Sequence, residues 1–132
     1  MTSETITLIL PLPNRVLSPN CPAGTRRGRM MKAAATKKYR AVAKDIAEQV
    51  QLETGPWAKA QARLIFHWKD RRRRDIRNAE SMMKPAYDGI VDAGVLVDDS
   101  YDHLTHLPTQ FECDPECPRV EVVIERLDGE DQ

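Results

Sequence analysis

The sequence predicts a small α/β fold in which a mixed β-sheet is packed with two main helices. Segments rich in β-branched or alternating apolar residues occur near both ends and in the middle of the chain. Two segments with apolar residues at three- and four-residue spacings lie between them. This order is typical of a sheet with helices packed on it. The length predicts a single domain over residues 1–132, large enough to bury a core without disulfides or a structural metal.

The first part of the chain predicts a strand, a loop and a helix. Thr5–Leu10 is apolar and β-branched, and prolines follow it, so we expect a strand. Residues 14–32 combine prolines, glycines and several cations, which predicts a mobile basic loop. Residues 33–52 place apolar side chains at helical spacing, and Gly55 followed by Pro56 is expected to end this helix.

The middle of the chain predicts a second strand and an interrupted helix. Ala60–Trp68 alternates with a period of two, which is typical of a strand. Asp75 or Asn78 can cap the next helix, which is expected to end before Gly94. Pro85 is expected to kink or restart that helix, because proline is best tolerated in a first helical turn.

The last part of the chain predicts one or two further strands. Residues 102–112 favour a strand that Pro108 weakens. Residues 119–127 alternate clearly between apolar and charged side chains, which indicates a strand. Residues 128–132 are expected to form a polar tail that is frayed.

Charge is strongly segregated along the chain, although the formal net charge is zero. Residues 1–44 carry nine Lys and Arg against one acid, whereas residues 88–132 carry thirteen Asp and Glu against two arginines. Local field matters more than the total charge, because screening acts over about 10 Å. The zero net charge therefore does not exclude nucleic-acid binding.

The cysteine content and hydropathy predict a cytoplasmic protein. The chain has three cysteines, an odd number, and we interpret them as reduced thiols. Its apolar runs are far shorter than the ~20 residues of a membrane span, and no signal peptide is recognisable at its start. We therefore expect no association with a membrane.

The strongest motif is the segment KDRRRRDIRN, residues 69–78, which contains four consecutive arginines. Such a run can be a solvated loop, but four adjacent guanidinium groups repel each other, and Asp70 and Asp75 supply only two anions. Guanidinium groups match the geometry of phosphate oxygens. The run therefore predicts contact with a nucleic-acid backbone, with about two of the four arginines facing one ligand.

Three carboxylates form a candidate metal site for Mg²⁺, or alternatively Mn²⁺. Asp75 precedes the interrupted helix, and Asp98 and Asp99 follow it. Carboxylates are the ligands that Mg²⁺ prefers. The break at Pro85, or a partner subunit, is needed to bring the two ends together, since an unbroken helix of about 17 residues is about 25 Å long. Asp75 as a helix cap and Asp98–Asp99 as a turn remain alternatives, and Lys84 between them reads as a surface lysine.

A structural zinc site is a weaker alternative. Cys113 and Cys117 are separated by three residues, and no second cysteine pair follows them. The three histidines show no recognised metal-ligand spacing. A zinc site that uses both cysteines and one histidine is possible on composition alone.

Together these segments resemble the RusA family of Holliday-junction resolvases, which are small phage-type endodeoxyribonucleases. The resemblance covers most of the chain. It includes the opening strand with its PLPN sequence, the RRRRD-x-x-N segment and the final VEVVIE strand. It also includes KPAYDGI from Lys84 and the DAGVLVDD segment that ends at Asp99, which is the most specific part.

The resemblance implies a RusA-like homodimer that binds four-way DNA junctions and nicks two opposing strands with Mg²⁺, in recombination and repair. It also implies a phage or prophage gene expressed in a bacterial cytoplasm. When the family's site residues are mapped onto this sequence, Asp75 matches the first acid. Asp99, with Asp98 beside it, matches the distal acid. Lys84 matches the lysine that the family carries in the helix between the two acids. DNA-binding residues are then expected in the arginine run and the basic loop: Arg71, Arg72, Arg73, Arg74, Arg77, Arg26, Arg27, Arg29 and Lys32.

Arg77 departs from the family pattern, which usually has a second acid two residues after the first. In addition, Lys84 lies about one turn further from Asn78 than in the best-known pattern. We therefore consider Glu80 or Asn78 as a replacement metal ligand, and a weakened or inactive junction-binding protein as the alternative function. A third hypothesis for the function is an unrelated interaction module whose arginines bind an acidic protein.

Overall fold

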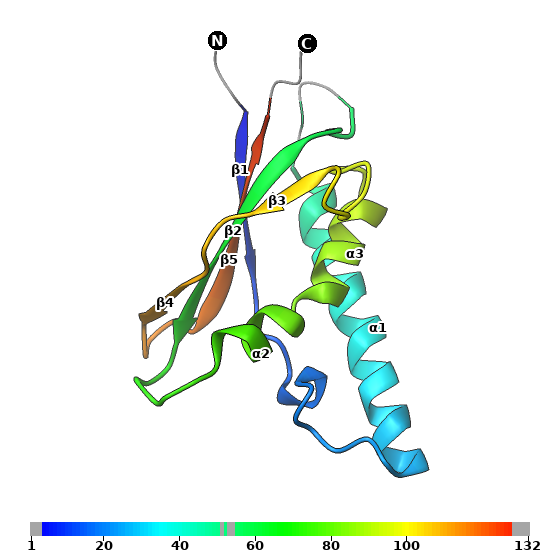
Figure 1. Cartoon of the computed structure of the whole chain (residues 1–132), viewed down its shortest axis with the longest axis vertical. Helices are drawn as coiled ribbons and strands as arrows, with labels where there is room; N and C mark the ends of the chain where they lie inside the picture. Colours follow the sequence, from blue (N-terminus) through cyan, green and yellow to red (C-terminus); the bar gives the residue numbers. More distant parts are fainter. Residues whose placement is uncertain (1–3, 51, 53–54, 128–132) are drawn as a thin grey trace.

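Five strands form one mixed sheet, and the helices pack on one of its faces (Figure 1). This computed structural model describes residues 4–50, 52 and 55–127, so the predicted polar tail lies outside the described residues. The strands are β1 (Thr5–Leu10), β2 (Ala60–Trp68), β3 (Leu104–His106), β4 (Gln110–Cys113) and β5 (Arg119–Arg126). The helices are η1 (Arg15–Leu17), α1 (Arg26–Glu48), α2 (Ile76–Ser81) and α3 (Lys84–Asp92). The predicted α/β class with a mixed sheet is confirmed.

Strand β5 lies between β1 and β2 and is antiparallel to both. The other edge of β2 is shared by β3 and β4, which are parallel to it. His106 pairs with Ala62 and Gln110 pairs with Ile65, so three residues of the edge stand opposite two residues of β2. This local bulge contains Pro108, which cannot donate a ladder hydrogen bond. The predicted weakening of the strand at Pro108 is therefore confirmed.

The core lies between the sheet and the helices. In β2 and β5 every second side chain is buried, among them Phe66, Val122 and Ile124, whereas the intervening side chains are half-buried. This alternation is the one predicted from the sequence, because a period of two sends successive side chains to opposite faces. No helix among the described residues is both long and apolar enough to cross a membrane.

Helix α1 begins at Arg26, so the prediction of a loop throughout residues 14–32 was wrong. The Thr25 hydroxyl accepts a hydrogen bond from the Gly28 N–H and satisfies one of the free donors of the first turn. The basic residues that follow are good helix formers. The glycines and prolines of this segment suggested a loop, but the cap at Thr25 decided where the helix starts. The helix ends at Glu48, before the predicted end at residue 52.

The predicted break before Pro85 is confirmed. Helix α2 ends at Ser81 and α3 begins at Lys84, which places Pro85 in the first turn of α3. Proline has no N–H to donate to the carbonyl four residues earlier, so it ends one helix and is tolerated at the start of the next. Gly94 follows α3 with a φ of 86°, the left-handed conformation that suits glycine after a helix.

Helices α1 and α3 approach closely at Gly89. An added Cβ atom at this position would lie 2.2 Å from the carbonyl oxygen of Arg40, so a larger residue does not fit. The Arg40 guanidinium also forms a two-pronged ion pair with Asp92, at 2.6 and 2.9 Å. These contacts fix α3 on α1, and with it the position of Lys84 at the start of α3.

Candidate functional site

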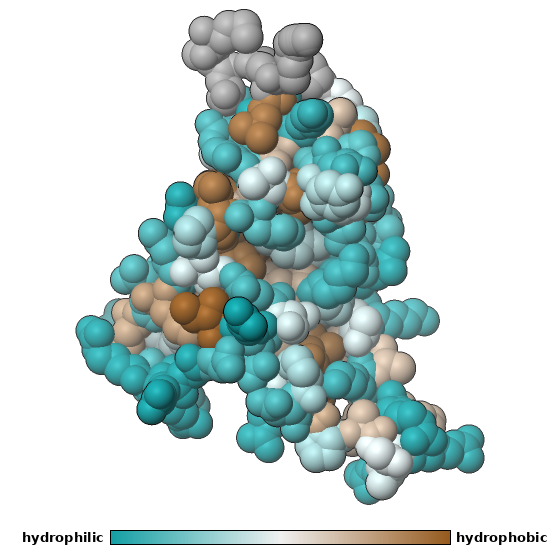
Figure 2. All heavy atoms as spheres, in the orientation of Figure 1, coloured by the Kyte–Doolittle hydropathy of each residue, from teal (hydrophilic) through white to brown (hydrophobic). Residues whose placement is uncertain are grey.

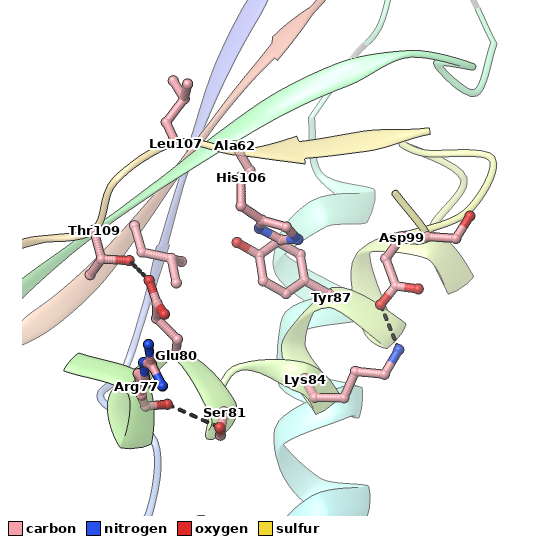
Figure 3. A pocket seen from close by; sticks show the side chains of 12 residues that line it. Ala62, Arg77, Glu80, Ser81, Lys84, Tyr87, Asp99, His106, Leu107 and Thr109 are labelled. Atoms are coloured by element: carbon pink, nitrogen blue, oxygen red, sulfur yellow. Dashed lines mark hydrogen bonds and ion pairs between the residues drawn. The ribbon is translucent and has the colours of Figure 1, made fainter. Parts of the chain in front are cut away.

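A cleft of about 810 Å³ lies between α2, α3 and the sheet edge formed by β2 and β3 (Figure 3). Figure 2 shows apolar atoms in the hollow between sheet and helices, surrounded by hydrophilic side chains. The residues that line the cleft are Ala62, Leu64, Arg77, Glu80, Ser81, Lys84, Tyr87, Asp99, Ser100, His106, Leu107 and Thr109. Two carboxylates and two cations therefore face one largely apolar cleft.

Lys84 and Asp99 meet at one end of the cleft. The Lys84 ammonium donates to the Asp99 carboxylate at 2.6 Å and to Asp88 at 3.0 Å. The hydrogen bond to Asp99, followed by the one to Asp88, raises the pKa of Lys84 above its usual value. The lysine therefore stays charged at neutral pH. The prediction that Lys84 and the distal acid lie together agrees with this geometry, and Asp88 joins them as a second partner of the lysine.

Glu80 faces the cleft from α2 and accepts a hydrogen bond from the Thr109 hydroxyl (Figure 3). The bulge at Pro108 brings Thr109 to this position, because an extra residue in a strand re-aims the side chains around it. Sequence reasoning missed Thr109, since a strand weakened by proline does not reveal the direction of its side chains. Glu80 itself was considered as a replacement acid, and its position in the cleft is compatible with that role.

Tyr87 and His106 complete the cleft wall between the two carboxylates. Their rings meet edge to face, with centroids 5.2 Å apart. Tyr87 is nearly fully buried, and burial together with the charges of Glu80 and Asp99 raises the pKa of its hydroxyl. The sequence analysis did not single out Tyr87 as a site residue. Its spacing of three residues from Lys84 on one helix was the available signal that both side chains share a face.

Asp75 and Asp98 lie outside the set of side chains that line the cleft. The Asp75 carboxylate caps α2 and accepts hydrogen bonds from the N–H groups of Arg77 and Asn78. The Asp99 N–H and the Ser100 hydroxyl hold the pKa of Asp98 below its usual range. Both residues therefore have the local roles, helix cap and turn, that the sequence left open as alternatives to metal binding.

The cleft offers two carboxylates, Asp99 and Glu80, which are the kind of oxygen donor that Mg²⁺ accepts. Within residues 4–50, 52 and 55–127, no three His, Cys, Asp or Glu side chains cluster closely enough to form a metal cage. Mg²⁺ is commonly held by one or two carboxylates together with water and substrate phosphates. Asp99 and Glu80 each present a carboxylate to the cleft from opposite walls, so each can supply one ligand to such a cation, whereas Asp75 is engaged as the cap of α2.

The four consecutive arginines have different roles. Arg74 stacks on the Trp68 ring, with its guanidinium carbon 4.2 Å from the ring centroid, and donates to Asp70 at 2.8 Å. Arg72 also pairs with Asp70, at 3.5 Å. Arg71 and Arg73 form no ion pair or hydrogen bond through their side chains within the described chain. Among the described residues, the structure thus leaves the side chains of Arg71 and Arg73 unpaired, and their contact with a nucleic-acid backbone stays a prediction.

Arg77 lines the cleft on α2, one turn before Glu80. Its side chain is exposed, and it forms no ion pair with any described residue. A guanidinium group at this position repels a cation but attracts a phosphate. Arg77 therefore suits the predicted DNA-binding role better than any role in metal binding.

The remaining predicted DNA-binding residues, Arg26, Arg27, Arg29 and Lys32, lie in the first two turns of α1. Figure 1 shows that this end of α1 extends beyond the sheet, at the opposite end of the molecule from the termini. Arg29 donates to the Gly24 carbonyl at 3.3 Å, and Lys32 donates to the Ser18 carbonyl at 3.2 Å. These cations form a basic helical surface, which replaces the mobile loop expected from the sequence.

The alternative zinc site finds no support in the side-chain arrangement. The three cysteines are free thiols. No cluster of three possible zinc ligands occurs among the described residues, which include both Cys113 and Cys117. Asp114, near both, is held by Arg119 at 2.8 Å.

No protein-family model matches this chain, and no curated protein matches it significantly. The similarity to the RusA family therefore rests on the residues quoted above. The cleft geometry stands independently of that similarity.

Proposed function

We propose that this protein is a Mg²⁺-dependent endodeoxyribonuclease that binds four-way DNA junctions as a homodimer and resolves them by paired nicks. The observation that carries the proposal is the cleft in which Lys84 contacts Asp99 and Glu80 lies on the opposite wall. The motifs shared with RusA resolvases support the choice of a junction as substrate. Two symmetric cuts require two active sites related by a twofold axis, which favours a dimer.

The residues of the cleft suit phosphodiester hydrolysis. Asp99 and Glu80 would hold the cation, which supplies charge neutralisation and a more acidic water when bound. Lys84 would stabilise the negative charge that develops on the phosphate or on the departing 3′ oxygen. Arg77, Arg71 and Arg73 would bind the backbone beside the cleft. Mn²⁺ is expected to substitute for Mg²⁺, because both accept oxygen ligands in octahedral geometry.

A second candidate is a junction-binding protein without nuclease activity. Arg77 favours it, because a cation occupies the position of the family's second acid and faces the same cleft. The Asp75 cap favours it too, since one carboxylate oxygen is already engaged with backbone N–H groups. This candidate predicts tight binding of junctions with no metal-dependent cleavage.

The test is cleavage of a labelled four-way junction, with and without Mg²⁺, beside a linear duplex of the same sequence. Asp99→Asn is the inactivating variant, and Asp102→Asn, an exposed turn residue outside the cleft lining, is its matched control. Paired nicks that need metal and vanish only in Asp99→Asn support the nuclease. Junction binding without nicks favours the second candidate, and no preference for the junction over the duplex rules out both.

A further inference from the structure

The Tyr87 hydroxyl is a buried polar group without a partner. Its oxygen is inaccessible to water, and it makes no hydrogen bond to any described residue. Tyr87 nevertheless lines the cleft, and Figure 3 shows its hydroxyl directed toward the side of the cleft where Glu80 and Thr109 lie. Most buried polar groups have a hydrogen-bond partner, and leaving one unpaired is costly. An unpaired hydroxyl that faces a cleft therefore indicates an acceptor brought by a ligand.

The packing around Tyr87 fixes the direction of this hydroxyl. The residue lies in the first turn of α3, and its backbone N–H donates to the Met83 carbonyl at 3.1 Å. The His106 ring abuts the tyrosine ring at an interplanar angle of 82°. Because the ring is buried against His106, the hydroxyl stays directed toward the cleft, and a ligand oxygen reaches it through a small shift of the side chains around it.

The charges in the cleft limit which chemical group can accept a hydrogen bond from the Tyr87 hydroxyl. Burial, and then the negative charges of Glu80 and Asp99, raise the pKa of the Tyr87 hydroxyl, so the group remains an O–H donor. A ligand for this donor must carry an acceptor oxygen. It must also suit a cleft that contains the cations Arg77 and Lys84. A phosphate oxygen meets both conditions, since charged acceptors form the stronger hydrogen bonds.

We propose that the Tyr87 hydroxyl donates a hydrogen bond to a non-bridging oxygen of a DNA phosphodiester bound in the cleft. This inference rests on the proposed function and deepens it, because it names a neutral phosphate-binding residue at the cleft floor. Lys84 and Arg77 attract the phosphate by charge, which acts in every direction. The Tyr87 hydroxyl adds a fixed direction and thereby orients the phosphate between the two carboxylates.

The test compares Tyr87→Phe with Tyr39→Phe, because both tyrosines are buried and only one has a hydroxyl partner. The Tyr39 hydroxyl donates to the Pro11 carbonyl at 2.7 Å, and Tyr39 is not among the residues that line the cleft. Tyr39→Phe is therefore expected to lower thermal stability while leaving DNA binding and cleavage unchanged. Tyr87→Phe keeps the ring and its contact with His106, so its thermal stability is expected to equal or exceed that of the wild type.

Phosphate recognition is measured in two ways on the full chain. The first is single-turnover cleavage of the junction, which is expected to slow about ten- to hundredfold in Tyr87→Phe, the usual effect of losing a hydrogen bond to a charged group. The second is the affinity for a 5′-phosphorylated dithymidylate without metal, which is expected to weaken about tenfold. Cleavage by Tyr87→Phe at the wild-type rate, or a loss of stability equal to that of Tyr39→Phe, would overturn the inference.

The dinucleotide-binding measurement distinguishes a failure of this inference from a failure of the proposed function. If the wild type binds junctions but does not cleave them, the proposed nuclease fails, and weaker dinucleotide binding by Tyr87→Phe alone still supports the inference. If the wild type cleaves junctions and both proteins bind the dinucleotide equally, the nuclease stands and the inference fails. A wild type that does not bind the dinucleotide at all also overturns the inference.

Discussion

The Lys84 ammonium lies 2.6 Å from the Asp99 carboxylate, although the two residues are fifteen positions apart in the sequence. This contact exists because α3 starts anew at Lys84 and spans only nine residues before Gly94 reverses the chain. The return segment is held on the sheet side by Trp57, whose N–H donates to the Val95 carbonyl at 2.8 Å. The helix break, the glycine and the Trp57 contact thus assemble one end of the cleft.

Replacing Lys84 with Met should slow single-turnover junction cleavage by about a hundredfold or more, the usual effect of removing one group that stabilises developing charge. The side chain of Lys84 is 63% exposed, so the free energy of unfolding should change little. Lys44→Met is the matched control, since Lys44 forms a similar exposed pair with Glu48 on α1. Equal cleavage rates in the two variants would contradict a catalytic role for Lys84.

Replacing Glu80 with Gln should raise the Mg²⁺ concentration needed for half-maximal cleavage, because a neutral amide is a weaker ligand for a hard cation. The expected shift is about tenfold, comparable to the loss of a group that supports a metal site. The measurement is a Mg²⁺ titration of the cleavage rate, with Glu48→Gln on α1 as control. An unchanged Mg²⁺ dependence would show that Glu80 does not replace the missing acid.

Replacing Arg71 and Arg73 together with Gln should weaken DNA binding uniformly across sequences and leave stability intact. Each lost phosphate contact reduces the slope of log affinity against log salt by about one, so a decrease of about two is expected. Arg74→Gln should instead destabilise the fold, since Arg74 stacks on Trp68 and is paired with Asp70. Salt titrations of junction binding and thermal melts distinguish the two outcomes. An unchanged salt slope in the double variant would exclude these arginines from DNA contact.

Gly89→Ala should destabilise the protein by about 1–3 kcal/mol, the range for forcing extra volume into a packed interface. The new Cβ would meet the Arg40 carbonyl oxygen at 2.2 Å, and backbone atoms cannot rotate away. Gly24→Ala is the control, because its Cβ would meet no atom within 4 Å. Its expected change is within about 0.5 kcal/mol. Equal melting temperatures for the two variants would contradict the close contact of α1 and α3.

The ion pair between Arg40 and Asp92 should make stability depend on pH in acid. The hydrogen bond from Arg40 lowers the pKa of Asp92 below 3.8, so the folded state binds this proton less readily than the unfolded state. The contribution is present above pH 3.8 and is lost as pH falls through the folded-state pKa. The stability difference between wild type and Asp92→Asn should therefore be constant at neutral pH and shrink below pH 3.8. A constant difference throughout the acid range would contradict this assignment.

Local patterns predicted most elements, because each depends on neighbours in the sequence. The alternation in Ala60–Trp68 and β5 gave the correct strands, and Pro85 marked the correct helix break. The start of α1 was wrong, because one capping contact at Thr25 outweighed the prolines and glycines around it. Elements that depend on a single side-chain contact are the hardest to locate from composition.

The candidate site was predicted in part. Lys84, Asp99 and Glu80 line one cleft, as the motifs suggested, whereas Asp75 and Asp98 have local capping roles. Tyr87, Thr109 and His106 were missed as site residues. The direction of Thr109 depends on the bulge opposite β2, which leaves no periodic signal in the sequence, whereas the helical spacing of Tyr87 from Lys84 was a signal that could have been used.

The sequence by itself determined the order of strands and helices, the break at Pro85 and the chemical character of the cleft, because these follow from short-range sterics and residue type. The tertiary structure decided which charges meet. It paired Lys84 with Asp99, tied Arg74 to Trp68 while leaving Arg71 and Arg73 free among the described residues, and aimed the Tyr87 hydroxyl into the cleft. The pairing of Lys84 with Asp99 depends on where α3 starts and how it packs on α1, and the stacking of Arg74 on Trp68 depends on the turn of the chain after β2, so both require the folded chain to fix residues together by packing.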